Sequence, residues 1–340
     1  ETVPLDEDID AILKSGDIEV HCGTKIGGDI TFESLRKDYD AVYLALGAQI
    51  GNRMPMENAD AENVIPAADF LQQVAKGQAM DLTGKRVVII GGGNVAMDAA
   101  RTAARLQAAT IHVFTRKRDD MTALASEVQS AMQEGVRFRT LLNFLHIEAE
   151  KESGRVCAVW LQPEILGPYD KNGMMTTEHS SAYPYRFKCD LLILGVGQRS
   201  DSAHFASQGL PVDRGRILAD ETCRVQNMDG VFSGGDCVTG PKTAIRAIAA
   251  GKVAAANIDN YLGFDHKIRL DVDVPAPKLD DKPHCGRVNM KEREPMVRNS
   301  DFELMEIAMS EKEVSQEANR CLRCDHFGCG IFRGGRDTEW

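Results

Sequence analysis

Three small residues, Gly91, Gly93 and Ala96, have the spacing of the G-x-G-x-x-G/A pattern with which a backbone binds a dinucleotide. The first glycine permits a tight turn, the second lets the backbone approach a pyrophosphate, and the small third residue lets a helix pack closely on the preceding strand. The N–H groups of Asn94 and Val95 would meet the pyrophosphate at the start of that helix, where the helix dipole favours an anion. A glycine turn with a purely structural role is the alternative.

The elements around this turn have the order that such a site requires. Residues 87–90 are apolar and β-branched, which predicts a buried parallel strand, and residues 99–106 are rich in Ala and Arg, which predicts a helix. A second β-branched strand is expected over 110–115. The order strand, glycine turn, helix and strand therefore predicts a nucleotide-binding unit.

The end of the second strand bears on the type of nucleotide. An NAD site normally has Asp or Glu here to hold the ribose 2′-hydroxyl, but this chain has Thr115, followed by Arg116 and Arg118. Guanidinium groups pair well with a 2′-phosphate, so the sequence favours NADP(H) over NAD(H). A solvated basic turn is the alternative.

Two further apolar strands end in glycine turns that a ligand could approach. The strand expected over 41–46 ends at Gly47, and the strand expected over 189–194 ends at Gly195 and Gly197. Paired strand ends of this kind would suit crossovers between two nucleotide-binding domains. Core strands that end in ordinary turns are the alternative.

A carboxylate with a binding role is expected at Asp236, which with Gly235 follows a short buried strand at the edge where open α/β sheets bind ligands. It could accept hydrogen bonds from a polyol such as the ribityl chain of a flavin. Pro241 is a natural first helical residue, and the N–H groups around Thr243 and Ala244 could stabilise negative charge on a reduced isoalloxazine ring. An aspartate that only closes a turn is the alternative.

Cysteines near the end of the chain could hold a metal. Cys321 and Cys324 have C-x-x-C spacing at the end of a predicted helix, and Cys329 adds a third sulfur. The fourth ligand could be Cys285, His284 or His326. Four cysteines suit zinc or an iron–sulfur cluster, whereas three cysteines and a histidine favour zinc. Free structural thiols are the alternative.

Composition limits the class of protein. The 340 residues allow two domains with good cores, and 43% hydrophobic with 27% charged residues is ordinary for a globular chain. The net charge of −11 argues against nucleic acid and anionic membranes as partners. No apolar run approaches the about 20 residues of a membrane span, and no signal peptide is visible. Nine cysteines, without disulfide-scaffold density, predict a reducing, cytoplasmic compartment.

The rest of the chain alternates helical and strand patterns. Other helices are expected over residues 6–14, 32–37, 67–74, 123–134 and 310–320, and other strands over 18–21, 136–140, 144–150, 155–162 and 231–233. The helix over 310–320 opens with a capping box, Ser310 to Glu313. Residues 168–184 are a polar excursion without periodicity, and residues 265–300 are an extended, proline-rich linker.

Several of these segments resemble the small subunit of NADPH-dependent glutamate synthase and the NADP-binding subunit of electron-bifurcating ferredoxin:NADP oxidoreductase. They are the run 91–98, the arginine-bearing turn with Met121, the Gly234-Gly235-Asp236 turn, residues 241–251 and the closing run 320–325. The resemblance implies an α/β fold with two dinucleotide-binding, Rossmann-like domains, in which an NAD(P) domain is inserted in a truncated FAD domain. It implies FAD and NADP as cofactors, hydride transfer from nicotinamide to flavin, and a larger redox partner subunit with iron–sulfur clusters.

The resemblance also divides the chain. A partial FAD-binding domain is expected over 1–50, a connection over 51–83, the NAD(P)-binding domain over 84–195, the rest of the FAD domain over 196–264 and a cysteine-containing tail over 265–340. The family's cysteine-rich N-terminal domain and first glycine fingerprint have no counterpart in residues 1–50, so we interpret the chain as most of one flavoprotein module.

Two residues depart from the family pattern. Thr115-Arg116 stands where NADP-type members have adjacent arginines, and Ala45-Leu46-Gly47 stands where Ala-Thr-Gly is usual. Hydride transfer needs stacking and electrostatics more than an acid or base, so no catalytic side chain is predicted. The alternative function is a non-catalytic nucleotide-binding subunit of a larger redox complex. A simple NADP-dependent dehydrogenase is disfavoured, because it would leave the Gly-Gly-Asp turn unexplained.

Overall fold

The largest element of the protein is a five-stranded parallel sheet. The computed structural model describes residues 3–116, 121–171, 173–267 and 282–322. In spatial order the sheet consists of β3 (Val64–Pro66), β11 (Leu191–Leu194), β4 (Arg86–Ile90), β5 (Thr110–Phe114) and β6 (Arg137–Arg139). All four pairings are parallel. The central strands β11 and β4 are mainly apolar because both faces of the sheet are covered there, whereas the edge strand β6 keeps two exposed arginines.

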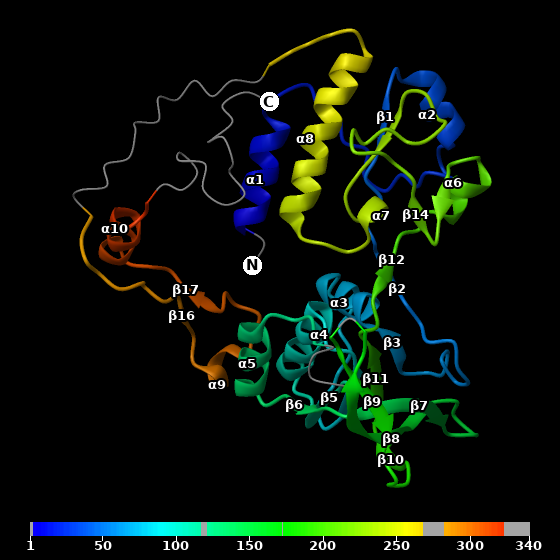
Figure 1. Cartoon of the computed structure of the whole chain (residues 1–340), viewed down its shortest axis with the longest axis vertical. Helices are drawn as coiled ribbons and strands as arrows, with labels where there is room; N and C mark the ends of the chain where they lie inside the picture. The colour runs from blue at the N-terminus through cyan, green and yellow to red at the C-terminus, as the bar shows by residue number, and fades with distance from the viewer. Residues whose placement is uncertain (1–2, 117–120, 172, 268–281, 323–340) are drawn as a thin grey trace.

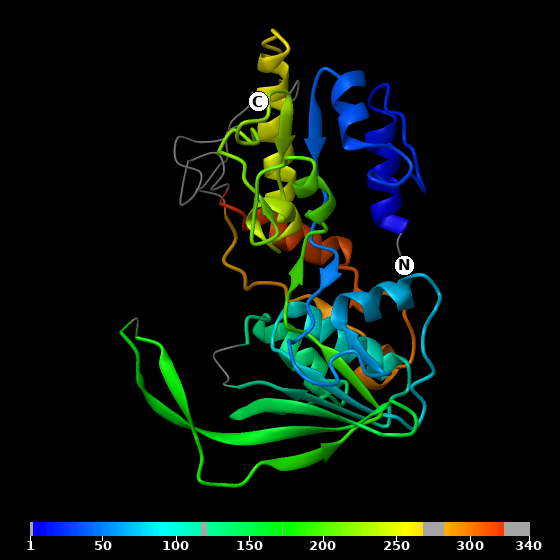
Figure 2. The same ribbon diagram turned by 90° about the vertical axis from the view of Figure 1, so that its right-hand side faces the viewer.

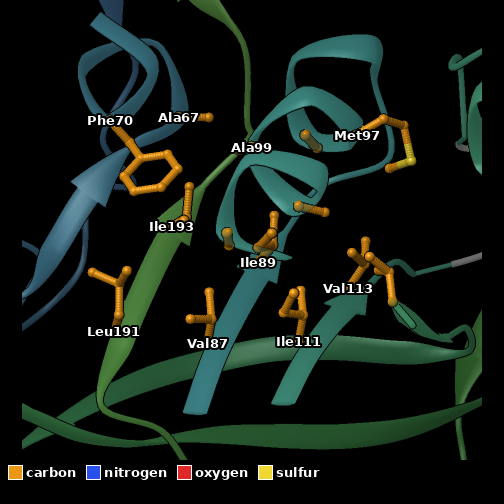
Figure 3. Packing of buried hydrophobic residues seen from close by; sticks show 14 of the residues in the cluster. Ala67, Phe70, Val87, Ile89, Met97, Ala99, Ile111, Val113, Leu191 and Ile193 are labelled. Carbon is orange, nitrogen blue, oxygen red and sulfur yellow. The ribbon is translucent and has the colours of Figure 1, made fainter. Parts of the chain in front are cut away.

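One face of this sheet packs on helices. Successive residues of a strand point to opposite faces, so Val87 and Ile89 lie under the helices together with Ile193 (Figure 3). The helices are α3 (Ala67–Ala75), α4 (Asn94–Arg105) and α5 (Ala125–Gln133). Small residues of α4 allow it to lie close to the sheet.

The other face packs on an antiparallel sheet, which Figure 2 shows below the parallel one. Val88 and Leu192 meet Val159 of this second sheet in one core. Its strands are β7 (Leu142–Ala149), β8 (Val156–Tyr169), β9 (Met175–His179) and β10 (Tyr185–Lys188). The prediction that 168–184 lacks regular structure was therefore wrong, because β9 forms there by pairing with the far half of β8.

A smaller unit is built around two parallel strands, β1 (Val42–Leu44) and β15 (Val231–Ser233). Its core includes Phe32, Leu44, Phe205 and Val231. The other elements of this unit are α1 (Val3–Leu13), α2 (Phe32–Asp38), α6 (Ala203–Ser207), β13 (Val212–Asp213), β14 (Arg216–Ile217), α7 (Asp236–Thr239) and α8 (Ala244–Tyr261).

Two crossovers join the units (Figure 1). β2 (Ile50–Gly51) and β12 (Gln198–Arg199) pair antiparallel between them. The Ser200 hydroxyl donates to the Gly47 carbonyl and so ties one crossover to the other. The strands predicted over 41–46 and 189–194 lead through their glycine turns into these two crossovers, as expected.

The C-terminal segment lies against the helices of the larger unit. It contains β16 (Lys291–Glu292), α9 (Pro295–Arg298), β17 (Glu306–Ile307) and α10 (Glu311–Asn319). The expected capping box of α10 is present, with Ser310 and Glu313 bonded reciprocally. The described part of 265–300 is thus more structured than the extended linker predicted there.

Three other expectations need correction. Residues 18–21 form no strand, because Ile18 and Val20 are exposed and have no strand partner among the described residues. Pro241 is not the first helical residue, because α8 begins at Ala244 with Thr243 as N-cap. β3 and α3 fall within 51–83, so the segment expected as a connection supplies a strand to the larger sheet. None of the helices in the described ranges is both long and apolar enough to cross a membrane.

Candidate nucleotide-binding site

The carboxyl ends of three adjacent parallel strands meet at one edge of the larger sheet. β11, β4 and β5 lie side by side and lead directly into Gly195, Gly91 and Thr115. The cavity at this edge has a volume of about 260 Å³, below the range of about 300–1,000 Å³ typical of ligand sites, so it would hold part of a dinucleotide. Its lining combines the strand ends with apolar side chains from the crossover and β7: Met54, Leu142, Phe144 and Val196.

Close backbone approach requires small residues at Gly91, Gly195 and Ala96, whereas a Cβ at Gly93 would meet only the Thr122 hydroxyl, at 3.5 Å. Gly91 has φ of +132°, and a Cβ there would lie 2.2 Å from the carbonyl oxygen of Gly195. A Cβ at Gly195 would in turn lie 2.8 Å from the Ala96 Cβ. The glycine turn, α4 and the end of β11 are therefore packed at a distance that no larger side chain permits.

The start of α4 presents unused N–H groups. Gly93 is the N-cap and has no side chain to satisfy them, while the amides of Ala96 and Met97 both donate to the Gly93 carbonyl. Among the described residues, no acceptor is found for the amides of Asn94 and Val95. This is the arrangement that binds an anion at a helix N-terminus.

Thr115 and Arg116 complete this edge of the cavity. The Thr115 amide donates to the Arg139 carbonyl at 3.0 Å, which fixes its position beside β6. Thr115 is buried, and its hydroxyl has no hydrogen-bond partner in the described parts of the chain. Arg116 is the one basic residue among the described residues that line the cavity. Arg118 lies outside the described residues.

The far end of α4 is fixed by the C-terminal segment. The Glu134 carboxylate, with a fully buried side chain, accepts from Arg101 at 2.7 and 3.0 Å, from Arg105 at 3.3 Å and from Arg298 at 2.8 Å. Burial alone would raise the pKa of Glu134, but these guanidinium groups lower it overall. Glu292 also pairs with Arg298, so a second carboxylate offsets the positive charge of the three guanidinium groups. Nothing in the sequence distinguished these residues, since the cluster joins positions more than 160 residues apart.

The residues predicted to contact a flavin lie in the smaller unit, after the carboxyl ends of β1 and β15 and at the start of α8. Gly47 and Gly235 have φ of +64° and +76°, and Gly235 leads into Asp236. The Asp236 carboxylate accepts from the Lys242 amide at 3.0 Å, so this residue does close a turn. Thr243 does not cap α8 with its side chain, and no acceptor among the described residues meets the Ala244 amide. Figure 1 shows α7 and the first turn of α8 at the end of this unit that faces the larger one.

Gly197 belongs to the crossover rather than to either core. It has φ of +96°, and its carbonyl accepts from the Asn52 amide at 3.0 Å. Its role in the structure is therefore to join β12 to the other crossover, next to the cavity wall at Val196.

The predicted metal ligands are only partly described. Cys321 is exposed and Cys285 half-buried, while Cys324 and Cys329 lie outside the described residues. Gln316 of α10 donates to the Gly286 carbonyl at 2.9 Å, and Glu317 accepts from the Val288 amide. Residues 286–288 thus lie against residues 316 and 317 of α10. Within the described ranges, no three His, Cys, Asp or Glu residues are grouped for metal binding.

Comparisons with known proteins agree with this architecture. Residues 6–251 match the family model described as pyridine nucleotide-disulphide oxidoreductase. The chain is 33% identical to the NADP(+)-dependent formate dehydrogenase subunit beta of Moorella thermoacetica, over 98% of this chain and 49% of that relative. It is 33% identical to the glutamate synthase [NADPH] small chain of Escherichia coli, over 72% of this chain and 55% of that relative.

The chain therefore spans about half the length of these curated relatives. The fold is similar to that of Mycobacterium tuberculosis FprA solved in complex with NADPH, with a TM-score of 0.65 over 76% of this chain and 72% of that chain, at 18% identity. The resemblance to the glutamate synthase small subunit and the α/β fold with Rossmann-like domains are both confirmed. The chain belongs to the pyridine nucleotide-disulphide oxidoreductase family.

Proposed function

We propose that this chain is a flavin-dependent NAD(P)H oxidoreductase module that passes hydride between NADP(H) and FAD. The observation that carries the proposal is the convergence of three strand ends around Gly91, beside the unused amides at the start of α4. The arginine-bearing turn after β5 supports a nucleotide with a 2′-phosphate. The relatives named for NADP or NADPH support the same choice.

The residues present fit a nicotinamide dinucleotide. The amides of Asn94 and Val95 would hold the pyrophosphate, and Arg116 would meet the adenosine end. The apolar wall formed by Met54 and Val196 would exclude water from the side of the cavity next to the crossover. These groups bind and orient, and no proton has to move through a side chain.

The residues present also fit the flavin end of FAD. Gly47 and Gly235 have positive φ, so their backbones can approach a ligand where a side chain would be strained. Asp236 would accept hydrogen bonds from the ribityl hydroxyls through its remaining lone pairs, and the Ala244 amide would meet negative charge. When bound, FAD would supply the hydride-accepting ring.

The electrons would leave through a larger partner subunit that carries iron–sulfur clusters. The formate dehydrogenase relative is named as a subunit and the glutamate synthase relative as a small chain, which supports a partner. Cys285, Cys321, Cys324 and Cys329 would hold zinc or a 4Fe–4S cluster. The hydrogen bonds from residues 316 and 317 of α10 to residues 286 and 288, which follow Cys285, support Cys285 as a ligand. Zinc and iron measured per chain should fall in Cys285→Ser and not in the control Cys22→Ser, whose thiol is exposed and distant in sequence.

The absorption spectrum of the purified native complex tests the function. We expect a flavin band that NADPH bleaches under anaerobic conditions. A flavin-free complex, or a band that neither NADPH nor NADH bleaches, would contradict the proposal.

The second candidate is a nucleotide-binding subunit without catalysis. It is favoured by the small size of the flavin-facing sheet, which has two strands among the described residues. Binding of NADP+ by a complex without flavin would support this second function.

A further inference from the structure

The start of α5 is bonded to the glycine turn that precedes α4. Leu124, the N-cap of α5, donates its amide to the side-chain oxygen of Asn94 at 3.3 Å. The Ala123 amide donates to the Gly92 carbonyl at 3.1 Å. Asn94 is the first residue of α4, and its own amide is one of the two that would hold the pyrophosphate. Any shift of α5 is therefore felt at the candidate nucleotide site.

A single guanidinium of α4 bonds to both ends of α5. Arg101 donates to the Glu127 carboxylate, in the first turn of α5, at 2.8 Å. It also donates to Glu134, the C-cap of the same helix, at 2.7 and 3.0 Å. The Arg101 side chain is 6% exposed, so packing holds the guanidinium between its two carboxylates. The bond with Glu127 therefore fixes the end of α5 that contacts Asn94.

The C-terminal segment takes part in the same network through α9. One oxygen of Glu134 accepts both from Arg298 at 2.8 Å and from Arg101 at 2.7 Å. All three side chains are almost completely buried, and removal of one partner from a buried ion pair is costly for the other. Hydrogen bonds thus connect α9 to the start of α5, through Glu134, Arg101 and Glu127 in turn.

The charge of Glu127 shows in which way this residue can assist a nucleotide. It is not among the residues that line the 260 Å³ cavity, and its carboxylate would repel the pyrophosphate. A favourable contribution can therefore come only from the position that Glu127 gives to its neighbours. Groups that bind a ligand must be held within about 0.5 Å of the productive geometry by supporting contacts, and the bond from Glu127 to Arg101 is such a contact.

We propose that Glu127 is a positioning residue of the nucleotide site, and that its bond with Arg101 makes NADP(H) affinity depend on the seating of the C-terminal segment through Arg298. This inference rests on the proposed function and adds the regulation of the same site. Whatever loosens α9 from Glu134 weakens NADP(H) binding. Glu127 itself takes no part in hydride transfer.

Titration calorimetry of the native complex with NADP+ tests the positioning role. We expect Glu127→Leu to weaken binding about three- to tenfold, within the range of couplings carried by packed networks. Glu127→Gln keeps an oxygen that accepts from Arg101 and removes the repulsion, so it should bind NADP+ at least as tightly as the unmodified protein. The control is Glu62→Leu, which should change no affinity. Glu62 also accepts from an arginine, at 2.9 Å, but it precedes β3 and so lies at the opposite edge of the parallel sheet.

A double-mutant cycle tests the connection with the C-terminal segment. Arg298→Met removes the α9 donor from Glu134 and should weaken NADP+ about two- to fivefold. In a Glu127→Leu background the same change should weaken it less than twofold, because the connection is already interrupted. Arg298→Lys keeps the charge with fewer donors and provides a milder second variant for the same cycle.

The outcomes that overturn the inference differ from those that overturn the function. NADP+ affinity that is unchanged or raised in Glu127→Leu would overturn the positioning role, since loss of a negative charge alone can only help an anion to bind. Fully additive losses in Glu127→Leu and Arg298→Met would overturn the connection with the C-terminal segment. An unmodified complex that binds no NADP+ would overturn the proposed function and the inference with it.

Discussion

The two units of this chain are both built from parallel strands and helices, but they differ in how far the apolar side chains of these elements are buried. In the larger unit, Val87, Val88 and Ile89 of β4 are all fully buried, because helices cover one face of the sheet and antiparallel strands cover the other. In the smaller unit, Ala254 alone is buried among the residues of α8, all of which are described. Ile245 and Ile248 of that helix are 73% and 60% exposed.

This difference in burial indicates which unit is the more stable when isolated. Burial of apolar side chains is the main favourable contribution to folding, and the larger unit obtains it on both faces of its sheet. The smaller unit leaves apolar side chains of α8 in contact with solvent, and contiguous surfaces of this kind are typical of sites that another segment or protein covers. We therefore expect the chain as given to unfold in two steps, with the larger unit second.

The largest effect should come from the buried ion cluster that fastens the C-terminal segment to the larger unit. Glu134→Leu would leave the guanidinium groups of Arg101, Arg105 and Arg298 buried without their shared carboxylate, at a cost of about 3–5 kcal/mol. Urea unfolding, followed by the fluorescence of Trp160 on β8 in a Trp340→Phe background, measures this loss in the second step.

The control for this variant is Glu127→Leu. Glu127 bonds to Arg101 through one contact and its side chain is 37% exposed, so its loss should cost about 0–1 kcal/mol. Equal losses in the two variants would mean that the cluster does not stabilise the larger unit.

The glycine turn should give the next largest effect. Gly91→Ala places a Cβ against the Gly195 carbonyl at positive φ, and we expect about 2–4 kcal/mol of destabilisation with loss of nucleotide binding. Gly84→Ala is a matched control, because φ is also positive (+73°) but nothing lies within 4 Å of the new Cβ. It should cost about 1 kcal/mol and leave binding intact. Similar costs at both positions would refute close packing at the turn.

A conservative pair of substitutions tests the contrast in burial itself. Ile193→Val removes one methylene from the fully buried strand β11 and should cost about 1 kcal/mol. The same change at Ile248 of α8 should cost about 0.2 kcal/mol or less in the chain as given, because that side chain is already in water. Equal costs in thermal unfolding would show that α8 is covered in solution.

The smallest expected effect concerns acid. Hydrogen bonds from the Arg86 guanidinium and amide lower the pKa of Asp190 from 3.8 to about 2. The same hydrogen bonds join the starts of β4 and β11. The stabilisation is present above pH 4 and is lost as the pH falls toward 2. Since both side chains are partly exposed, Asp190→Asn should cost about 0.5 kcal/mol at pH 7 and flatten the stability profile between pH 4 and 2. An unchanged acid profile would contradict this role.

The sequence predicted best what depends on local pattern. The strand, turn and helix from β4 to α4 follow from β-branched residues and glycines whose spacing fixes their geometry, and the capping box fixed the start of α10. Residues 18–21 show the limit of this reasoning, because the apolar residues Ile18 and Val20 suit a strand but find no partner. β9 shows the reverse, because a polar segment becomes a strand when β8 supplies the ladder.

The candidate site was predictable only in part for the same reason. Gly91, Gly93 and Ala96 can be recognised in the sequence by their spacing. The structure shows the close contact with Gly195 that requires Gly91 and Ala96. The buried state of the Thr115 hydroxyl and the cluster around Glu134 depend on segments far apart in sequence. Neither follows from the residue types alone.

The most direct test of the nucleotide site is hydrogen exchange of the native complex with and without NADP+. We expect slower exchange of amides at 91–97, 113–116 and 195–197, with no change in α10 or the far half of α8. A complex that binds NADP+ while these amides exchange at an unchanged rate would contradict it.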